Sequence, residues 1–370
     1  MDTAVICDRN ILDIFPKTHI ETFNLYGRDI NIALLNINYD EYLNKEIPET
    51  SILVKIKSFS CNYRDKSLIL TYSDICKHKS KEGKYFYSPF GSEFVAEVLK
   101  VGEKVTSLNI GDKVIPNMAY PFRDKDKLGG VISNFASQRI QIFEENQLLK
   151  IKEGMPEMVA AAFTLGSQTA YSMIRKADIK GGENILITAA TSNTSLCLIS
   201  ALNNENVNIY AITSSIEYEA DLIKLGVKKV IPYNNISDNN KELTSIKPDI
   251  VLDPFFDIYF DKLIKHINVN GKYIYCGFYN QNILYPSLTT KKSFEVTFAE
   301  FLSYSIKKNI TIIANCLGTT NDLLKALDFF YEGKYSPVIY NKNTSISLMS
   351  FLETSFHKKK KFGKVVFSYN

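Results

Sequence analysis

The stretch "ILITAATSNTSLCLISA", Ile185 to Ala201, joins a short apolar run to an apolar helical pattern through small and polar residues. This order is typical of a strand, a tight turn and a helix. In a doubly wound sheet such a turn presents backbone NH groups and a helix N-terminus to a dinucleotide pyrophosphate. Glycine usually fills the turn, but the stretch contains none. It therefore predicts either an altered phosphate loop or a capped helix in an α/β protein that binds no nucleotide.

The segments on either side of this stretch differ in pattern. Downstream, the apolar runs "VNIYAITS" and "DIVLDP" alternate with the helical patterns "EYEADLIKLG" and "FDKLIKHI". Such alternation indicates βαβ units and a parallel sheet covered by helices on both faces. Upstream, from Ser51 to Lys150, short alternating patterns and glycine turns predict an all-β region.

Length and composition narrow the class of protein. The chain has 370 residues, 45% of them hydrophobic, and a formal net charge of +4, so we expect two globular domains and no nucleic-acid surface. We see no apolar run long enough to span a bilayer and no basic start typical of a secretory signal, which predicts a cytoplasmic protein without membrane contact. The six cysteines lack metal-binding spacings and are expected to be reduced. The basic run "HKKKK", residues 357–361, is expected to be a solvated turn, or else to help hold an anion.

The end of the second α/β strand bears on the choice of nucleotide. NAD sites usually place a carboxylate there for the ribose hydroxyls, and that charge would repel a 2′-phosphate. Thr213, Ser214 and Ser215 stand at this point instead. If the chain binds a nucleotide, NADPH is the better candidate.

The order of motifs resembles that of the medium-chain dehydrogenase/reductases, specifically their zinc-free, quinone-oxidoreductase-like branch. The matching segments are "VKIKSFSCNYRD", "GSEFVAEVLKVGEKVTSLNIGDKVI", "LGSQTAYSMIRKADIKGGENILITAA", "AITSSIEYEADLIKLGVKKVI" and "FGKVVF". The resemblance implies an α/β fold, with a GroES-like β-barrel catalytic domain at residues 1–160 and a doubly wound Rossmann domain at residues 161–317. Residues 318–370 would return to complete the catalytic domain, and the substrate would lie in the cleft against the nicotinamide.

The resemblance also implies a site without metal. Zinc alcohol dehydrogenases of this superfamily have Cys, His and Cys ligands, and the matching residues here are Asn62, Ser92 and Leu165, with Cys61 one residue from the first. Leucine cannot bind a metal. Without a Lewis acid, the expected reaction is hydride transfer from NADPH to the β-carbon of an activated C=C bond, with hydrogen-bond donors holding the enolate-like oxygen.

By family position, Asn62 and Tyr63 are the expected catalytic residues, with a turn cap and core packing as their alternative roles. Tyr85, or else Tyr87, stands near the position of a tyrosine proton donor in related enoyl reductases, although the spacing is inexact. The resemblance assigns these residues to the cofactor: Thr169, Ala189, Ser192, Asn193, Thr194, Ser214, Ser215, Tyr218, Cys276, Gly277, Phe278 and Lys364.

Some of these assignments have specific reasons. Ala189, Ser192 and Ser195 stand at the three glycine positions of the loop. Tyr218 replaces a lysine of many relatives, which weakens the case for NADPH. Lys364 matches a pyrophosphate-binding position of some relatives, with a surface lysine on an edge strand as its alternative.

Three further residues, Arg64, Asp65 and Cys276, are not expected to take part in the chemistry. Arg64 and Asp65 are expected to form a structural ion pair. Cys276 is not expected to be a nucleophile, because no sequence feature marks a base for it.

The substrate stays open at this point. A quinone, an enone, an enoyl thioester, or a dehydroalanine residue reduced to D-alanine in a lanthipeptide would each suit the chemistry. The segment "AYPFRDKDKLGGVISNFASQ", residues 119–138, is a candidate rim for a peptide substrate, or an ordinary solvated loop. A non-catalytic binding protein that has lost the cofactor is the alternative class. The apolar run "ITIIANCL", residues 310–317, predicts a homodimer through the edge of the Rossmann sheet.

Overall fold

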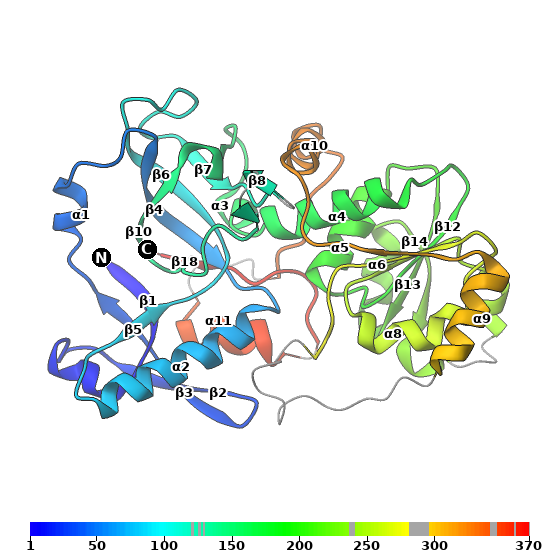
Figure 1. The fold of residues 1–370 in the computed structure, drawn as a ribbon, viewed down its shortest axis with the longest axis horizontal. Coiled ribbons are helices and arrows are strands. Elements are labelled where there is room, and N and C mark those ends of the chain that lie inside the picture. The colour runs from blue at the N-terminus through cyan, green and yellow to red at the C-terminus, as the bar shows by residue number, and fades with distance from the viewer. Residues whose placement is uncertain are drawn as a thin grey trace.

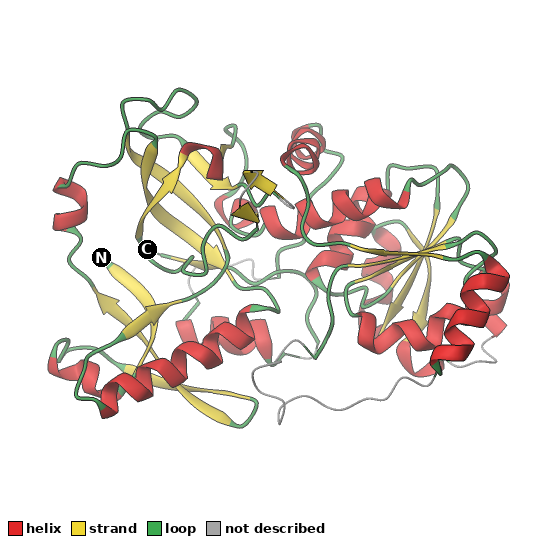
Figure 2. Ribbon diagram, viewed as in Figure 1, coloured by secondary structure: helices red, strands yellow, loops and turns green. Residues whose placement is uncertain are grey.

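The computed structural model describes residues 1–119, 122–124, 127–128, 130–236, 241–280, 296–340, 346–358 and 360–369. These residues form two lobes side by side along the long axis of the molecule (Figure 1). One is built mainly from antiparallel strands and is called the β lobe here. The other, the α/β lobe, is a parallel sheet between helices (Figure 2). The α/β fold class with a Rossmann-type sheet is thereby confirmed.

The β lobe contains two main sheets. The first has the order β2 (Ile20–Leu25), β3 (Arg28–Asn36), β1 (Asp2–Cys7), β5 (Tyr87–Pro89). The second has the order β10 (Ile140–Glu144), β4 (Ser51–Ser60), β6 (Glu93–Val101), β7 (Lys113–Pro116), β11 (Leu148–Lys150), with β18 (Phe367–Ser368) also paired to β4. Because Phe367 of β18 pairs with Phe59 of β4, the C-terminal end of the described chain lies in the same sheet as β4.

Smaller elements complete the β lobe. They are the strand pair β8 (Phe122–Asp124) and β9 (Lys127–Leu128) and the helices α1 (Asp40–Asn44), α2 (Asp65–Lys81), α3 (Glu157–Ala160) and α11 (Leu348–Phe356). The expectation of an all-β region from Ser51 to Lys150 is therefore wrong at α2. That helix buries Ile69, Ser73 and Cys76, whose three- and four-residue spacing is helical.

The α/β lobe is built on one six-stranded parallel sheet. Its order is β14 (Val227–Pro232), β13 (Asn208–Thr213), β12 (Asn184–Ile187), β15 (Ile250–Asp253), β16 (Lys272–Tyr275), β17 (Thr311–Ala314). The chain runs outward from β12 to β14 and then crosses to β15 on the other side of β12. This reversal is the switch point beside which doubly wound sheets bind ligands.

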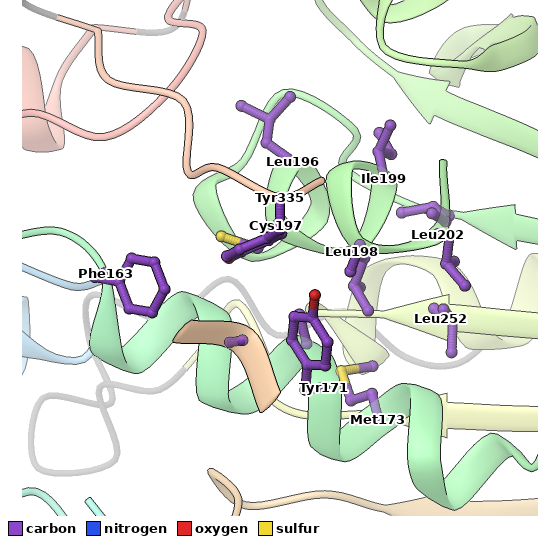
Figure 3. Close-up of a cluster of buried hydrophobic side chains, with 14 of the residues drawn as sticks. Phe163, Tyr171, Met173, Leu196, Cys197, Leu198, Ile199, Leu202, Leu252 and Tyr335 are labelled. Carbon is purple, nitrogen blue, oxygen red and sulfur yellow. The ribbon is translucent and has the colours of Figure 1, made fainter. Parts of the chain in front are cut away.

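Helices bury both faces of this sheet. One face packs against α4 (Thr164–Ala177), α5 (Asn193–Leu202) and α10 (Thr320–Tyr331). Figure 3 shows side chains of α4 and α5 in this cluster together with Tyr335. The other face packs against α7 (Lys241–Ile246), α8 (Phe256–Leu263) and α9 (Phe298–Lys308), while α6 (Glu219–Lys224) lies beside β14.

The first of these clusters joins the two lobes. It includes Val95 and Ile115 of β6 and β7 as well as Met173 of α4. The lobes therefore share apolar packing on either side of the site described below. In the described part of the chain, no helix is both long and apolar enough to cross a membrane.

Candidate active site

The two lobes meet at a cleft of about 610 Å³. Asn62 and Tyr63, which follow β4, line it from the β lobe, and Ser192 and Cys276 line it from the carboxyl ends of β12 and β16. The structure brings these predicted residues together at the cleft: Asn62, Tyr63, Thr169, Ser192, Asn193, Thr194, Cys276, Gly277 and Lys364. Burial raises the pKa of the Cys276 thiol to about 12, which disfavours its nucleophilic thiolate.

Other predicted cofactor residues lie outside the cleft lining, namely Ala189, Ser214, Ser215, Tyr218 and Phe278. Ser214 and Ser215 directly follow β13, and the Ser215 NH donates to Thr213 Oγ1 at 3.0 Å. The Tyr218 ring lies 5.2 Å from that of Phe362. Their roles in cofactor binding stay predictions.

Tyr85 is not brought to the cleft. Its side chain is exposed, and its hydroxyl forms a hydrogen bond of 3.3 Å with Asp13, whose charge raises the pKa of Tyr85. Tyr87, the alternative, lies on β5 opposite Cys7 and packs against the Phe15 ring. Neither tyrosine lines the site, so the approximate spacing matched a different part of the β lobe.

The loop after β12 keeps the backbone of a glycine loop without its glycines. Ala189, at the first glycine position, has a φ of 45°, a conformation that costs a residue with a Cβ about 1 kcal/mol. Ser192 is the N-cap of α5, and its Oγ accepts from the Ser195 NH at 3.4 Å. The strand, turn and helix expected from Ile185 to Ala201 are thus confirmed.

A glycine outside this loop, Gly166 of α4, allows close packing against it. Ser195 is fully buried and donates to the Thr188 carbonyl oxygen at 2.7 Å. On α4, a Cβ added to Gly166 would come within 2.5 Å of Asn193 Nδ2. The close approach of α4 to the start of α5 therefore depends on Gly166.

The residues at this end of the cleft fit a dinucleotide. The N-terminus of α5 opens on the cleft with Ser192, Asn193 and Thr194, and backbone amides at such a terminus bind phosphate. The buried Asn193 Oδ1 has no hydrogen-bond partner within the described part of the chain. A ligand hydroxyl or amide would satisfy this acceptor.

Asp253 is a buried hydrogen-bond acceptor next to the cleft wall. It accepts hydrogen bonds from Thr188 Oγ1 at 2.5 Å and from the Phe255 NH at 2.8 Å, and also from the Tyr273 hydroxyl. Burial raises the pKa of Asp253 to about 6. Because Phe255 lines the cleft, Asp253 connects the end of β12, through Thr188, to a residue of the cleft wall.

A buried polar cluster lies on the β-lobe side of the cleft. Glu93 is fully buried, and its Oε1 accepts from the Leu165 NH at 2.7 Å. Its Oε2 lies 3.2 Å from Lys364 Nζ and accepts from Asn62 Nδ2 at 3.3 Å. Lys364 Nζ also donates to Asn62 Oδ1. The ammonium of Lys364 therefore lies between an amide oxygen and a carboxylate.

The cluster contains Asn62, Ser92 and Leu165, the residues that the resemblance to the zinc alcohol dehydrogenases sets against the metal ligands. Asn62 Nδ2 donates to Ser92 Oγ at 3.1 Å, and Ser92 Oγ donates to Asp65 Oδ2 at 2.7 Å. Leu165 offers only hydrocarbon and a backbone NH that is already bonded to Glu93. Within the described ranges, no three His, Cys, Asp or Glu side chains lie together as a metal site would need. This donor set does not fit zinc.

Cations and aromatic rings line the rest of the cleft. Lys361 lines it and donates to the Ser355 carbonyl oxygen at 2.8 Å, and burial lowers the pKa of Lys361 to about 8. The Lys66 ammonium lies 4.2 Å from the centroid of the Tyr63 ring. Burial, with the neighbouring Tyr26 and Tyr279, raises the pKa of Tyr63. The cleft is thus positively charged close to the predicted catalytic tyrosine.

Two expectations for this region can now be judged. Arg64 and Asp65 form the expected ion pair at 3.3 Å. The basic run 357–361 is only partly a solvated turn, because Lys361 turns inward while Lys360 is exposed. Of the candidate peptide rim, residues 120–121, 125–126 and 129 lie outside the described residues, whereas Gly130, Val131 and Asn134 line the cleft.

Sequence reasoning missed Glu93 and Lys361. Glu93 carried a signal, since it directly precedes the apolar residues "FVA" of a strand-like pattern, and a carboxylate buried there would need a partner. Lys361 carried no such signal. Adjacent lysines look alike in sequence, and only the folded structure shows which one turns inward.

Comparisons with known proteins agree with this architecture. Residues 48–153 match the alcohol dehydrogenase GroES-like domain. The acryloyl-coenzyme A reductase of Metallosphaera sedula is 23% identical over 308 residues, covering 78% of this chain and 83% of that protein. A crystal structure of an NAD-dependent alcohol dehydrogenase superposes with a TM-score of 0.71 at 18% identity, covering 100% of both chains. A 2-octenoyl-CoA carboxylase reductase in complex with NADP and 2-octenoyl-CoA gives a TM-score of 0.69 at 18% identity, covering 99% of this chain and 87% of that one.

A GroES-like domain joined to a Rossmann domain, with a cleft between them, is the architecture of a two-domain oxidoreductase. Residues 48–153 therefore form an alcohol dehydrogenase GroES-like domain, and the described chain as a whole shares the fold of the solved alcohol dehydrogenases.

Proposed function

We propose that the protein is an NADPH-dependent reductase of an activated C=C bond that works without zinc. The observation that carries the proposal is the cleft, which joins a phosphate-type loop to a polar cluster where Lys364 stands in the place of a metal. The relatives named as acryloyl-coenzyme A reductase and 2-octenoyl-CoA carboxylase reductase support a C=C substrate. We propose an enoyl thioester as the substrate class.

The bound cofactor would supply the hydride to the β-carbon. Asn62 lies at the cleft, and its amide nitrogen donates to Ser92 and Glu93, which fixes the orientation of the amide. Lys361 can offer two further N–H donors beside its bond to Ser355. In a cleft with little water, such donors stabilise an enolate-like oxygen strongly. Tyr63 and Lys361 are the candidates to deliver the proton to the α-carbon.

The preference for NADPH over NADH rests on charge at the end of β13. Ser214 and Ser215 follow that strand where an NAD site would have a carboxylate. The nearby Glu217 is paired with Lys360 at 3.6 Å. Lys360, from the basic run, therefore offsets the negative charge of Glu217 beside Tyr218.

The first test is binding and turnover with the full chain. We expect NADPH to bind more tightly than NADH, and crotonyl-CoA to be reduced with consumption of NADPH, measured by nicotinamide fluorescence and absorbance. An enone, a quinone and a dehydroalanine peptide serve as competing acceptors. If NADPH fails to bind at about 1 mM, the upper end of common KM values, the proposal falls and a non-catalytic binding protein becomes the better interpretation.

The second test is the pH dependence through Lys361. If its ammonium acts on the substrate oxygen, turnover should fall as the pH rises through about 8, because the deprotonated amine carries no charge. K361M should lose at least tenfold in turnover and lose this basic limb, whereas K361R should move the limb to higher pH. The exposed Lys358 provides the control K358M. A basic limb that persists in K361M would remove Lys361 from the chemistry.

We also propose a homodimer formed through β17. This strand is an outer edge of the sheet in the described chain, and the neighbouring α9 exposes Phe298, Leu302 and Ile306 at helical spacing. An open edge beside an apolar stripe suits a two-fold interface. We expect light scattering to give a dimer that F298E/I306E converts to a monomer. The control variant is I223E on α6, which should remain a dimer. A monomeric wild type would refute the proposed dimer.

A further inference from the structure

A second cavity, of about 570 Å³, lies in the β lobe and shares no lining residue with the cleft. It is bounded by β1, β3, β4, β18 and the start of α11, elements that gather in the lobe away from the parallel sheet (Figure 1). Nothing in the proposed reaction uses it. Its side chains nevertheless have the character of a binding site.

Arg139 is the main evidence. It lines this cavity, is only 6% exposed, and stacks with its guanidinium carbon 4.2 Å from the centroid of the Tyr369 ring. Its Nε and Nη1 are buried and have no hydrogen-bond partner among the residues described. Buried guanidinium donors without an acceptor are costly and uncommon. The unmet donors therefore point to an acceptor supplied by a ligand.

A second cation lies beside the first. Lys55 lines the same cavity, and β4 places it opposite Ile140, the neighbour of Arg139. Burial, followed by the charge of Arg139, lowers the pKa of Lys55. No ion pair joins Lys55 to a described carboxylate. Arg139 and Lys55 thus place two neighbouring cations at the cavity, and such a pair favours an anion between them.

The nearby carboxylates form no ion pair with Arg139 in the described chain, although the charges of Asp2 and Glu157 partly oppose the burial that lowers the pKa of Arg139. Asp2 lines the cavity but accepts from Asn36 Nδ2 at 3.0 Å. Glu97 pairs with Lys57 at 3.6 Å, and Glu157 accepts from the Ser58 hydroxyl. Ser347 at the cavity wall is the N-cap of α11, so the positive end of that helix dipole adds to the field.

Most of the remaining wall is apolar, formed by Leu34, Ile346, Leu348 and Phe367, with Asn36 and Ser368 as further polar residues. The cavity thus combines cations with hydrocarbon in a volume suited to a small molecule. We propose that it binds a small amphipathic anion, with a carboxylate or phosphate head held by Arg139 and Lys55 and a short apolar chain against Leu34 and Phe367.

The test is calorimetric titration of the full chain with octanoate, octyl phosphate, octanol and inorganic phosphate. We expect at least one of the two amphipathic anions to bind in the micromolar to low millimolar range, and octanol and inorganic phosphate to bind at least tenfold more weakly. The tighter of the two anions identifies the head group. Saturating NADPH should leave the affinity unchanged, because the two cavities are separate. Displacement by NADPH would place the anion in the cleft and overturn the proposal.

Two variants locate the site. R139Q and K55M should each weaken binding of the anion at least tenfold, which corresponds to about 1.4 kcal/mol. The matched control is K57M, two residues along β4 and outside the cavity lining, which should bind as the wild type does. If R139Q fails to fold, K55M decides the question alone. Unchanged affinity in K55M, or no binding of either anion, would overturn the proposal whether or not the protein proves to be a reductase.

Discussion

The phosphate loop after β12 and the polar cluster around Glu93 both depart from the sequences of dehydrogenases, yet with different results. In the loop, Ala189 keeps a left-handed backbone and Ser192 keeps the helix cap, so the geometry survives the loss of glycine. In the cluster, Lys364 lies between Asn62 and Glu93. These side chains do not form the ligand set of a zinc site.

The difference follows from which atoms each region uses. A phosphate loop works through backbone NH groups and a helix terminus, and any small side chain leaves these in place. A metal site works through particular side-chain atoms, and neither Leu165 nor an amide nitrogen can replace a thiolate or an imidazole. A loop of this kind therefore tolerates other small residues, whereas a metal site does not tolerate replacement of its ligands.

The largest effect is expected in the cluster. E93Q removes the charge that faces the buried ammonium of Lys364, which is only 5% exposed. Breaking one partner of a buried ion pair leaves an uncompensated charge. We expect the free energy of unfolding, measured with urea, to fall by about 3 kcal/mol.

Strand β6 offers a matched control for E93Q. Glu97 lies on the same strand but forms an exposed pair with Lys57 at 3.6 Å. E97Q should change stability by less than about 1 kcal/mol. Equal losses in the two variants would show that the Glu93 pair is not buried in solution, and the contrast between cluster and loop would fail.

The next effect is expected in the loop. S192E puts a carboxylate at the N-cap of α5, where the pyrophosphate of a dinucleotide would lie. Repulsion between the two anions should weaken NADPH binding by about 100-fold, or about 2.7 kcal/mol, measured by nicotinamide fluorescence.

The control for S192E is S245E, on the exposed side of α7 in the same lobe. It adds the same charge far from the loop and should leave the affinity for NADPH unchanged. If S192E also binds NADPH normally, the loop does not contact the phosphates and Ala189 has only a structural reason for its conformation.

The sequence predicted the backbone framework well. The strand, turn and helix at Ile185 to Ala201 and the parallel sheet around them follow from periodicity, which depends on local residue order. Helix α2 was missed because its burial pattern lies within a region of alternating strands and carries several polar residues.

The side-chain partners in the site were harder to predict. Lys364 and Glu93 are far apart in sequence, and their contact exists only because the end of the chain returns beside β4. The same return turns Lys361 into the cleft while Lys360 stays exposed. Tyr85 was misplaced for a different reason, because approximate spacing along the sequence does not show which side of the β lobe a residue faces.

The smallest predicted effect is the one that probes the loop backbone most directly. Ala189 has a φ of 45°, which glycine adopts without strain. A189G should therefore stabilise the protein by about 1 kcal/mol against urea, with NADPH affinity kept or improved. The neighbouring Ala190 is buried and has no positive φ, so A190G should instead lose about 1 kcal/mol through greater freedom of the unfolded chain. Opposite signs at adjacent alanines would establish that position 189 retains a glycine conformation. A loss of stability in both variants would mean that the loop relaxes to an ordinary backbone in solution.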